Sequence, residues 1–213
     1  MKSRKRDWPM GASLIMDDFL ANPSFSVWQE LETACKKAEL WPVVRAGALQ
    51  YLAAGDERFE KQKDWPLPET GLRLETKHGR RNFPDYGILL RIAIHEKDVP
   101  ETARLFAAAS SEGQKSRWGV GLDAGLLNDI AKTVAADHPD TSVGIWKRHA
   151  EACIAETKPA SYPPAVEYLR KSRDLLKSKG RLLEWNEYFA HLLEKEKRKR
   201  RFMELVSYLK EEE

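Results

Sequence analysis

Apolar residues recur every three or four positions along most of the chain, which is the spacing of one buried face of an α-helix. Two of these runs open on the same kind of tripeptide, Pro100-Glu101-Thr102 and Pro139-Asp140-Thr141. Proline suits the first turn of a helix, and an acidic residue there complements the positive end of the helix dipole. The two copies start 39 residues apart, and a two-helix repeat occupies roughly 34–47 residues. The pattern therefore predicts stacked helical hairpins.

The first 55 residues carry three helical periods. The first predicted helix covers residues 11–21. The second begins near Ser26, because Ser26 and Gln29 have the spacing of a capping box. Pro42 opens the third helix, and Gly55 ends it. The residues predicted to be buried on the second and third helices are Val27, Leu31, Ala34, Cys35 and Ala38, and then Val43, Ala46, Leu49 and Leu52.

Residues 56–83 sustain no helical period and predict a long connection. Two prolines and a glycine interrupt the stretch Trp65-Pro66-Leu67-Pro68-Glu69-Thr70-Gly71-Leu72. Long connections in compact domains are usually functional or packed. Because Trp65, Leu67 and Leu72 are too apolar for a free linker, we expect them to press against the helices.

Helical periods resume at Pro84 and continue toward the C-terminus. We predict helices over 84–97, 100–109, 122–136, 139–156 and 164–179, and one long, bent helix over 185–210, with a looser joint over 110–121 and a loop over 158–163. Gly180 follows as a left-handed helix stop. No stretch alternates between apolar and polar residues as a strand does.

These patterns predict an all-α chain of stacked antiparallel helical hairpins. A basic N-terminal arm covers residues 1–10, and a single helical-repeat domain covers residues 11–213. The domain comprises N-terminal helices over 11–55, the long packed connection over 56–83, and repeat hairpins with the long C-terminal helix over 84–213.

Composition narrows the class of protein. Charged residues make up 32% of the chain and hydrophobic residues 42%, which is typical of a folded, soluble protein. No run of eighteen apolar residues occurs, so we expect no membrane span, and the basic start is followed by no apolar stretch of signal-peptide type. Cys35 and Cys153 can pair in principle, but so few cysteines favour a reducing cytoplasm. The net charge of +3 is too small to imply nucleic acid by itself.

Several stretches, found in one order along residues 25–210, carry a family resemblance. The most specific is Trp65-Pro66-Leu67-Pro68-Glu69-Thr70-Gly71-Leu72. The others are residues 41–45, 83–85 with 92–97, 138–139 with 145–147, 168–170, 180–181, 184–185 with 188, and 197–200. On these stretches the chain resembles the C-terminal helical region of bacterial SWIM-type zinc-finger proteins.

The resemblance implies a tetratricopeptide-like α-α superhelix beside a zinc-binding SWIM module thought to engage DNA or proteins. That module needs a Cys-x-Cys pair followed by a Cys-x-His pair, and this chain has neither. The resemblance therefore assigns no zinc ligand to any position. It implies either an excised C-terminal part of a longer protein or a relative that lacks the finger.

Candidate chemistry is sparse. His149 and Cys153 have the i, i+4 spacing that lets two helical side chains share an ion, but a structural zinc wants about four ligands, so core packing is the better interpretation. His138 is explained by its helix-start position. There is no nucleophile elbow, Walker loop or His-Glu-x-x-His motif, and Gly119-Val120-Gly121 lacks the strand of a dinucleotide site. Adjacent Asp17 and Asp18 point to different sides of a helix. We expect no enzyme, no catalytic residue, no metal and no cofactor.

The run Lys195–Arg201 has six cations and one acid, for a local charge of +5. It suits phosphate contacts, or else a solvated helix face whose long side-chain stems cover apolar neighbours. Four tryptophans are predicted core anchors: Trp28, Trp41, Trp146 and Trp185. Trp65 and Trp118 fall in loops, where an exposed indole is a candidate interface anchor.

The function predicted is that of a non-catalytic, cytoplasmic helical-repeat scaffold whose concave groove binds a protein or peptide partner. The residues predicted as possible partner contacts are Arg80, Arg81, Trp118, Lys197, Arg198, Arg200 and Arg201. The alternative is a nucleic-acid-binding accessory domain that contacts DNA or RNA. It requires the basic helix and the Lys77–Arg81 loop to lie on one continuous face. A deep pocket with paired titratable side chains would revive the enzyme alternative.

Overall fold

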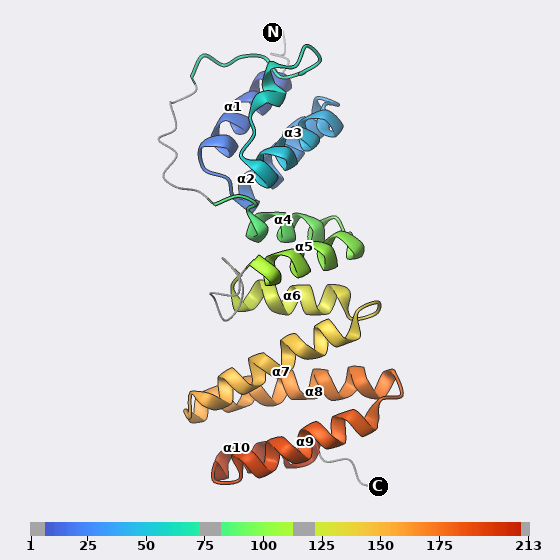
Figure 1. Ribbon diagram of the computed structural model, residues 1–213. Coiled ribbons are helices and arrows are strands. Elements are labelled where there is room, and N and C mark those ends of the chain that lie inside the picture. The colour runs from blue at the N-terminus through green and yellow to red at the C-terminus, as the bar shows by residue number, and fades with distance from the viewer. Residues whose placement is uncertain (1–6, 73–81, 113–121, 210–213) are drawn as a thin grey trace, which may run out of the picture. The chain divides into compact units, whose positions relative to one another are not determined.

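The computed structural model describes residues 7–72, 82–112 and 122–209, and every regular element in these ranges is helical (Figure 1). The predicted all-α class is confirmed. Contacts divide the chain into two compact units, Met1–Glu96 with Ala108–Gly121 and Lys97–Ala107 with Leu122–Glu213. This division does not test whether residues 11–213 form the single domain predicted, so that remains a prediction. Within the described ranges, no helix combines the length and apolar character needed to cross a bilayer.

The first unit is built from four helices and one short 3₁₀ segment. The helices are α1 (Trp8–Ala21), α2 (Phe25–Lys37), α3 (Trp41–Ala54) and α4 (Tyr86–His95), and the 3₁₀ segment is η1 (Arg58–Lys61). Side-chain oxygens cap three of these helices. Asp7 accepts from the amide of Met10, Ser24 from that of Val27, and Asp85 from that of Ile88. The predicted capping residue Ser26 is therefore wrong, because α2 starts at Phe25 and Ser24 performs that role.

The predicted buried face of α3 is wrong at Val43 and Ala46 and confirmed at Leu52. Val43 is 45% exposed and Ala46 is exposed. The face that is buried carries Val44, Gly47, Ala48, Tyr51 and Leu52. Helix α3 itself carries small or apolar residues on most of its sides, so the periodicity of its sequence alone does not show which side is buried. Tertiary contacts decide the orientation, because the buried Tyr51 hydroxyl donates to the carbonyl oxygen of Leu20 at 2.7 Å.

An aromatic cluster holds α1, α2 and α3 together. The ring of Trp28, which is fully buried, lies 6.0 Å from Phe19 and 5.0 Å from Trp41 between centroids. At the end of α4, the Glu96 carboxylate receives two hydrogen bonds from the Arg45 guanidinium, at 2.7 and 2.6 Å. Such forked pairs fix geometry as well as adding energy. The predicted role of Trp28 as a core anchor is confirmed.

The second unit repeats a two-helix period. Its helices are α5 (Val99–Glu112, shared with the first unit), α6 (Ala124–Val134), α7 (Pro139–Ala155), α8 (Tyr162–Ser178), α9 (Leu182–Glu196) and α10 (Arg200–Val206), with η2 (Pro159–Ser161) and η3 (Ser207–Leu209). Helices α6, α8 and α10 start at residues 124, 162 and 200, which is 38 residues from one to the next. Helices α5, α7 and α9 start at residues 99, 139 and 182, at intervals of 40 and 43. The Pro-acid-Thr tripeptides thus open alternate helices.

The core of the second unit lies where α8 packs against α7, α9 and α10. The Trp185 ring is fully buried and stacks on Phe189 at 4.8 Å, while Tyr162 contacts Phe202 at 5.7 Å. Trp146 is 5% exposed, and its indole N–H donates to Asn128 at 3.3 Å. The core positions predicted for these two tryptophans are confirmed.

The long C-terminal helix predicted over 185–210 is wrong, because α9 ends at Glu196 and α10 starts at Arg200. Two physical reasons favour the break. A continuous helix would place Lys195 beside Lys199 at i, i+4, and like charges at that spacing destabilise a helix. The turn also returns Phe202 and Val206 to the core, where both are fully buried.

Two lysines tie alternate helices together at their C-terminal ends. Lys179, which follows α8, donates to the carbonyl oxygen of Ala136 just beyond α6, at 2.9 Å. Lys199, which follows α9, donates to the carbonyl oxygen of Ile154 in the last turn of α7, also at 2.9 Å. A cation is favoured at the negative end of a helix dipole. The C-terminal ends of α6 and α8 therefore lie together, as do those of α7 and α9.

We expect Lys199→Met to lower the free energy of unfolding by about 1–2 kcal/mol, since it removes a charge-assisted hydrogen bond and a favourable dipole contact. Only 22% of the Lys199 side chain is exposed, and its ammonium also pairs with Glu196 at 2.6 Å. The matched control is Lys197→Met, whose side chain is 61% exposed and whose effect should stay within about 0.5 kcal/mol. Urea denaturation of the three proteins measures both values. Equal losses would contradict the structural role of Lys199.

Candidate functional site

Metal chemistry finds no support in the ranges 7–72, 82–112 and 122–209, where no group of three or more His, Cys, Asp or Glu side chains could hold an ion. His149 lies in the core, stacked on Tyr168 of α8 with ring centroids 5.0 Å apart. Burial lowers the pKa of His149 and raises that of the Cys153 thiol, which nearby Glu156 raises further. These contacts agree with the packing interpretation of the His149 and Cys153 pair.

Two further histidines lie at helix ends, His95 at the end of α4 and His138 before α7. His95 hydrogen-bonds Glu32 of α2 at 3.1 Å. Burial acts to raise the pKa of Glu32, but the hydrogen bonds from Lys36 and His95 outweigh it, so the pKa lies below its ordinary value. His138 stands at the N-cap of α7, as predicted, although its side chain accepts no capping bond from a backbone N–H.

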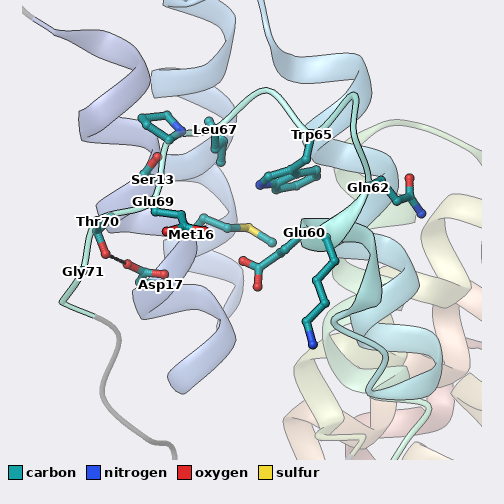
Figure 2. A pocket seen from close by; sticks show the side chains of 12 residues that line it. Ser13, Met16, Asp17, Glu60, Gln62, Trp65, Leu67, Glu69, Thr70 and Gly71 are labelled. Carbon is teal, nitrogen blue, oxygen red and sulfur yellow. Dashed lines mark hydrogen bonds between the residues drawn. The ribbon is translucent and has the colours of Figure 1, made fainter.

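A pocket of about 500 Å³ lies in the first unit, between α1 and the segment that follows α3 (Figure 2). Its lining residues are Ser13, Met16, Asp17, Glu60, Lys61, Gln62, Trp65, Leu67, Pro68, Glu69, Thr70 and Gly71. We call it the α1 pocket. Its volume falls in the range of small-molecule sites, roughly 300–1,000 Å³. The sequence did not predict it.

Residues outside the α1 pocket support its apolar side, which Trp65 and Leu67 form. Phe59, only 2% exposed, contacts the Trp65 ring at 4.8 Å between centroids. Both rings press on Gly47 of α3, where an added Cβ would lie 2.7 Å from Phe59 and 2.8 Å from Trp65. Because Gly47 has no side chain, the two aromatic rings can pack directly against the middle of α3. Leu67 is buried at 8% exposure, so the prediction that Trp65 and Leu67 press on the helices is confirmed.

The polar side of the α1 pocket is acidic. The Thr70 hydroxyl donates to the Asp17 carboxylate and accepts the backbone N–H of Leu72 at 3.1 Å. Figure 2 shows Asp17 beside Thr70, with Met16 extending from α1 toward the Trp65 ring and Glu60 below it. Asp18 is exposed and lines no part of the pocket. The two adjacent acids thus face different sides of α1.

The prediction for Leu72 is wrong, because its side chain is 70% exposed. The packed segment ends at Thr70, whose hydroxyl is bonded to Asp17. Gly71 then adopts a φ of +67°, a left-handed conformation that suits glycine and turns the chain. Leu72 therefore leaves the helices instead of continuing along them.

A network of side chains joins α7 to α9 in the second unit. The Tyr188 hydroxyl donates to Glu151 at 3.2 Å, and the Lys147 ammonium lies 4.2 Å from the centre of the Tyr188 ring. Burial, and then the Glu151 carboxylate, raise the pKa of Tyr188. We call this surface the α7–α9 face and define it by Asp140, Lys147 and Glu151 of α7, by Arg181 at the N-cap of α9, and by Glu184 and Tyr188 of α9.

The remaining charges of the α7–α9 face are also paired. Arg181 bonds Asp140 at 2.6 Å and Glu184 at 2.5 Å, and Lys147 lies 3.5 Å from Glu184. The pairs of Arg181 with Asp140 and of Lys147 with Glu184 join residues 41 and 37 positions apart, so no local pattern in the sequence could have revealed these two. Gly180, predicted to be a left-handed helix stop, has a left-handed φ of +70°.

The predicted contact residues near the C-terminus are partly neutralised within their own helices. Lys197 pairs with Glu194 at 2.5 Å, and Arg201 pairs with Glu204 at 3.0 Å. Arg198 and Arg200 are exposed, with no ion pair to another described residue. Arg80, Arg81 and Trp118 lie outside the described residues.

No protein-family model, curated protein or solved structure matches this chain. The resemblance to SWIM-type proteins therefore stays a prediction.

Proposed function

We propose that the chain is a non-catalytic helical-repeat scaffold that binds a protein or peptide partner in the cytoplasm. The proposed architecture is a tetratricopeptide-like α-α superhelix. The lysine ties of alternate helices and the regular helix starts support it, because stacked two-helix units place every second helix in one layer. Binding would act by surface complementarity, without turnover.

The observation that carries this proposal is the α7–α9 face. Its side chains are already ordered by contacts across the two helices, so a partner would encounter a preformed surface and binding would cost less side-chain entropy. A half-buried tyrosine held by two neighbours is a common kind of interface anchor. Beside it on α7, a Cβ added at Gly144 would meet nothing within 4 Å, which leaves room for a partner to approach the helix.

The alternative function, contact with DNA or RNA, rests on Arg198 and Arg200. Both are exposed at the junction of α9 and α10. Pairing of Lys197 and Arg201 with neighbouring glutamates reduces the field that a phosphate backbone would meet. The basic run therefore favours this alternative less than its composition alone suggests.

The α1 pocket suits binding rather than catalysis. The Ser13 hydroxyl donates to the carbonyl oxygen of Pro9 at 3.2 Å, and the Thr70 hydroxyl is bonded to Asp17 and Leu72. A nucleophile needs its hydroxyl directed to a base and open to substrate. The Ser13 hydroxyl is directed to a backbone carbonyl oxygen, which is not a base. The Thr70 hydroxyl donates to a carboxylate but also accepts the backbone N–H of Leu72, a contact that holds it in the turn.

Affinity capture from a lysate of the chain's own source cells tests the proposal, with and without nuclease and at low and high salt. We expect discrete protein partners that survive nuclease. Recovery that vanishes with nuclease and falls steeply with salt would overturn the scaffold and favour nucleic-acid binding.

A further inference from the structure

We propose that the α1 pocket binds a guanidinium group carried on an aliphatic arm, as in arginine. The pocket belongs to the first unit and the α7–α9 face to the second, so this inference does not depend on the proposed function. The shared chemistry has two sources, a free arginine-like molecule or an arginine side chain of a partner peptide.

Charge selects the sign of the ligand. The carboxylates of Asp17 and Glu69 line the α1 pocket, against one ammonium, that of Lys61. The formal balance of these three residues is therefore −1, and Glu60, which also lines the pocket, has an interaction of its own and is left out of this count. A phosphate or carboxylate ligand would be repelled, and a cation would be attracted. A bare metal ion is a poor fit, because the described residues form no group that could coordinate one.

The aromatic and aliphatic lining of the pocket favours a guanidinium group over an ammonium group. Trp65 is fixed by Phe59 and Gly47 on one side and lines the pocket together with Met16 and Leu67. Indole is the best aromatic partner for a cation, and arginine is the commoner one. A guanidinium is more weakly hydrated than an ammonium and stacks on aromatic faces, so it loses less on entering such a site.

Asp17 supplies the directional contact. Its Oδ2 accepts from Thr70, which orients the carboxylate. Neither its Oδ1 nor the Glu69 carboxylate is hydrogen-bonded to another described residue. A guanidinium presents several N–H donors in one plane and can bond the open carboxylate oxygen while its face rests on the indole. The Asp17 carboxylate is therefore oriented before the ligand arrives.

The test is a titration of the full ¹⁵N-labelled chain, followed by NMR at the Trp65 indole and the Asp17 and Thr70 amides. The probes are N-acetyl-arginine-methylamide and the matched citrulline compound, which has nearly the same shape and no charge. We expect saturable shifts with the arginine probe, at an affinity at least about tenfold above that of the citrulline probe, because charge-assisted hydrogen bonds are lost in the latter. Equal binding of the two probes, or no saturable shift, would overturn the proposal.

The matched variants are Asp17→Asn and Asp18→Asn, which make the same change at neighbouring positions. Asn retains an oxygen that accepts from Thr70, so Asp17→Asn should keep the fold. We expect Asp17→Asn to weaken arginine binding about tenfold or more and Asp18→Asn less than about twofold. Equal effects would show that bulk charge attracts the probe and would overturn the site.

A pentapeptide, Gly-Gly-Arg-Gly-Gly, distinguishes the two sources. Tighter binding than the blocked amino acid, with shifts that extend beyond the pocket lining, supports an arginine of a partner protein. Equal affinity with shifts confined to the pocket supports a free arginine-like molecule. If no partner is captured from lysate but the arginine probe still binds the α1 pocket, the proposed function of the α7–α9 face is wrong and the inference about the α1 pocket stands.

Discussion

Trp185→Ala is expected to lower the free energy of unfolding by about 3–5 kcal/mol, the usual cost of removing a large aromatic side chain from a core. Trp185 is fully buried, stacks on Phe189 at 4.8 Å and lies 6.0 Å from Tyr188. Its indole nitrogen has no hydrogen-bond partner among the described residues. The loss is therefore one of apolar packing, and it should disturb α9 together with the α7–α9 face.

Leu183→Ala is the control, because Leu183 lies in the same helix with its side chain 73% exposed. Its effect should stay within about 0.5 kcal/mol. Urea denaturation gives the two free energies, and amide hydrogen exchange locates the change. We expect Trp185→Ala to reduce protection in α8 and α9 while α1 and α2 keep theirs. A loss below about 1 kcal/mol for Trp185→Ala would contradict the assigned core.

Gly55→Ala is expected to cost about 2–5 kcal/mol, from two effects that act together. Gly55 ends α3 with a φ of +68°, where a residue with a Cβ loses about 1–2 kcal/mol. The added Cβ would also lie 2.7 Å from the Phe83 ring, and overpacking costs about 1–3 kcal/mol. Phe83 contacts the buried Tyr51 ring at 5.4 Å, so it cannot move away without disturbing the core.

Gly180 provides the matched comparison. It ends α8 with a φ of +70°, and an added Cβ there would meet nothing within 4 Å. Gly180→Ala should therefore show the backbone cost alone, about 1–2 kcal/mol. Thermal and urea denaturation of the two variants measure the difference. A Gly55→Ala variant no less stable than Gly180→Ala would show that the contact with Phe83 is not as described.

How far the sequence predicted the fold depends on how strongly each segment is patterned. Helix α9 places Trp185, Phe189 and Leu192 on one apolar face against a polar remainder, and the predicted core anchor Trp185 is buried there. Helix α3 is apolar on most sides, so its orientation depends on Phe59, Trp65 and Tyr51 instead of its own period. The break after α9 follows from the return of Phe202 to the core, a tertiary effect.

The candidate surfaces were harder to predict because both depend on long-range pairs. The α1 pocket brings Asp17 together with Thr70, 53 positions later. One signal was available, because a mid-helix glycine such as Gly47 often marks a close approach. The basic run was visible in the sequence, but its pairing and the tie from Lys199 to Ile154 were not. A stretch of cations shows charge without showing what the charge contacts.

The scaffold proposal is tested most directly by capture with two charge-reversal variants from nuclease-treated lysate. Asp140→Lys reverses the charge of a member of the α7–α9 face whose side chain is 77% exposed. Asp129→Lys makes the same change at an exposed, ion-paired aspartate of α6, outside that face. We predict that wild type and Asp129→Lys recover the same discrete partner and that Asp140→Lys loses it. Recovery of that partner by all three proteins, or loss of it from both variants, would contradict binding at the α7–α9 face.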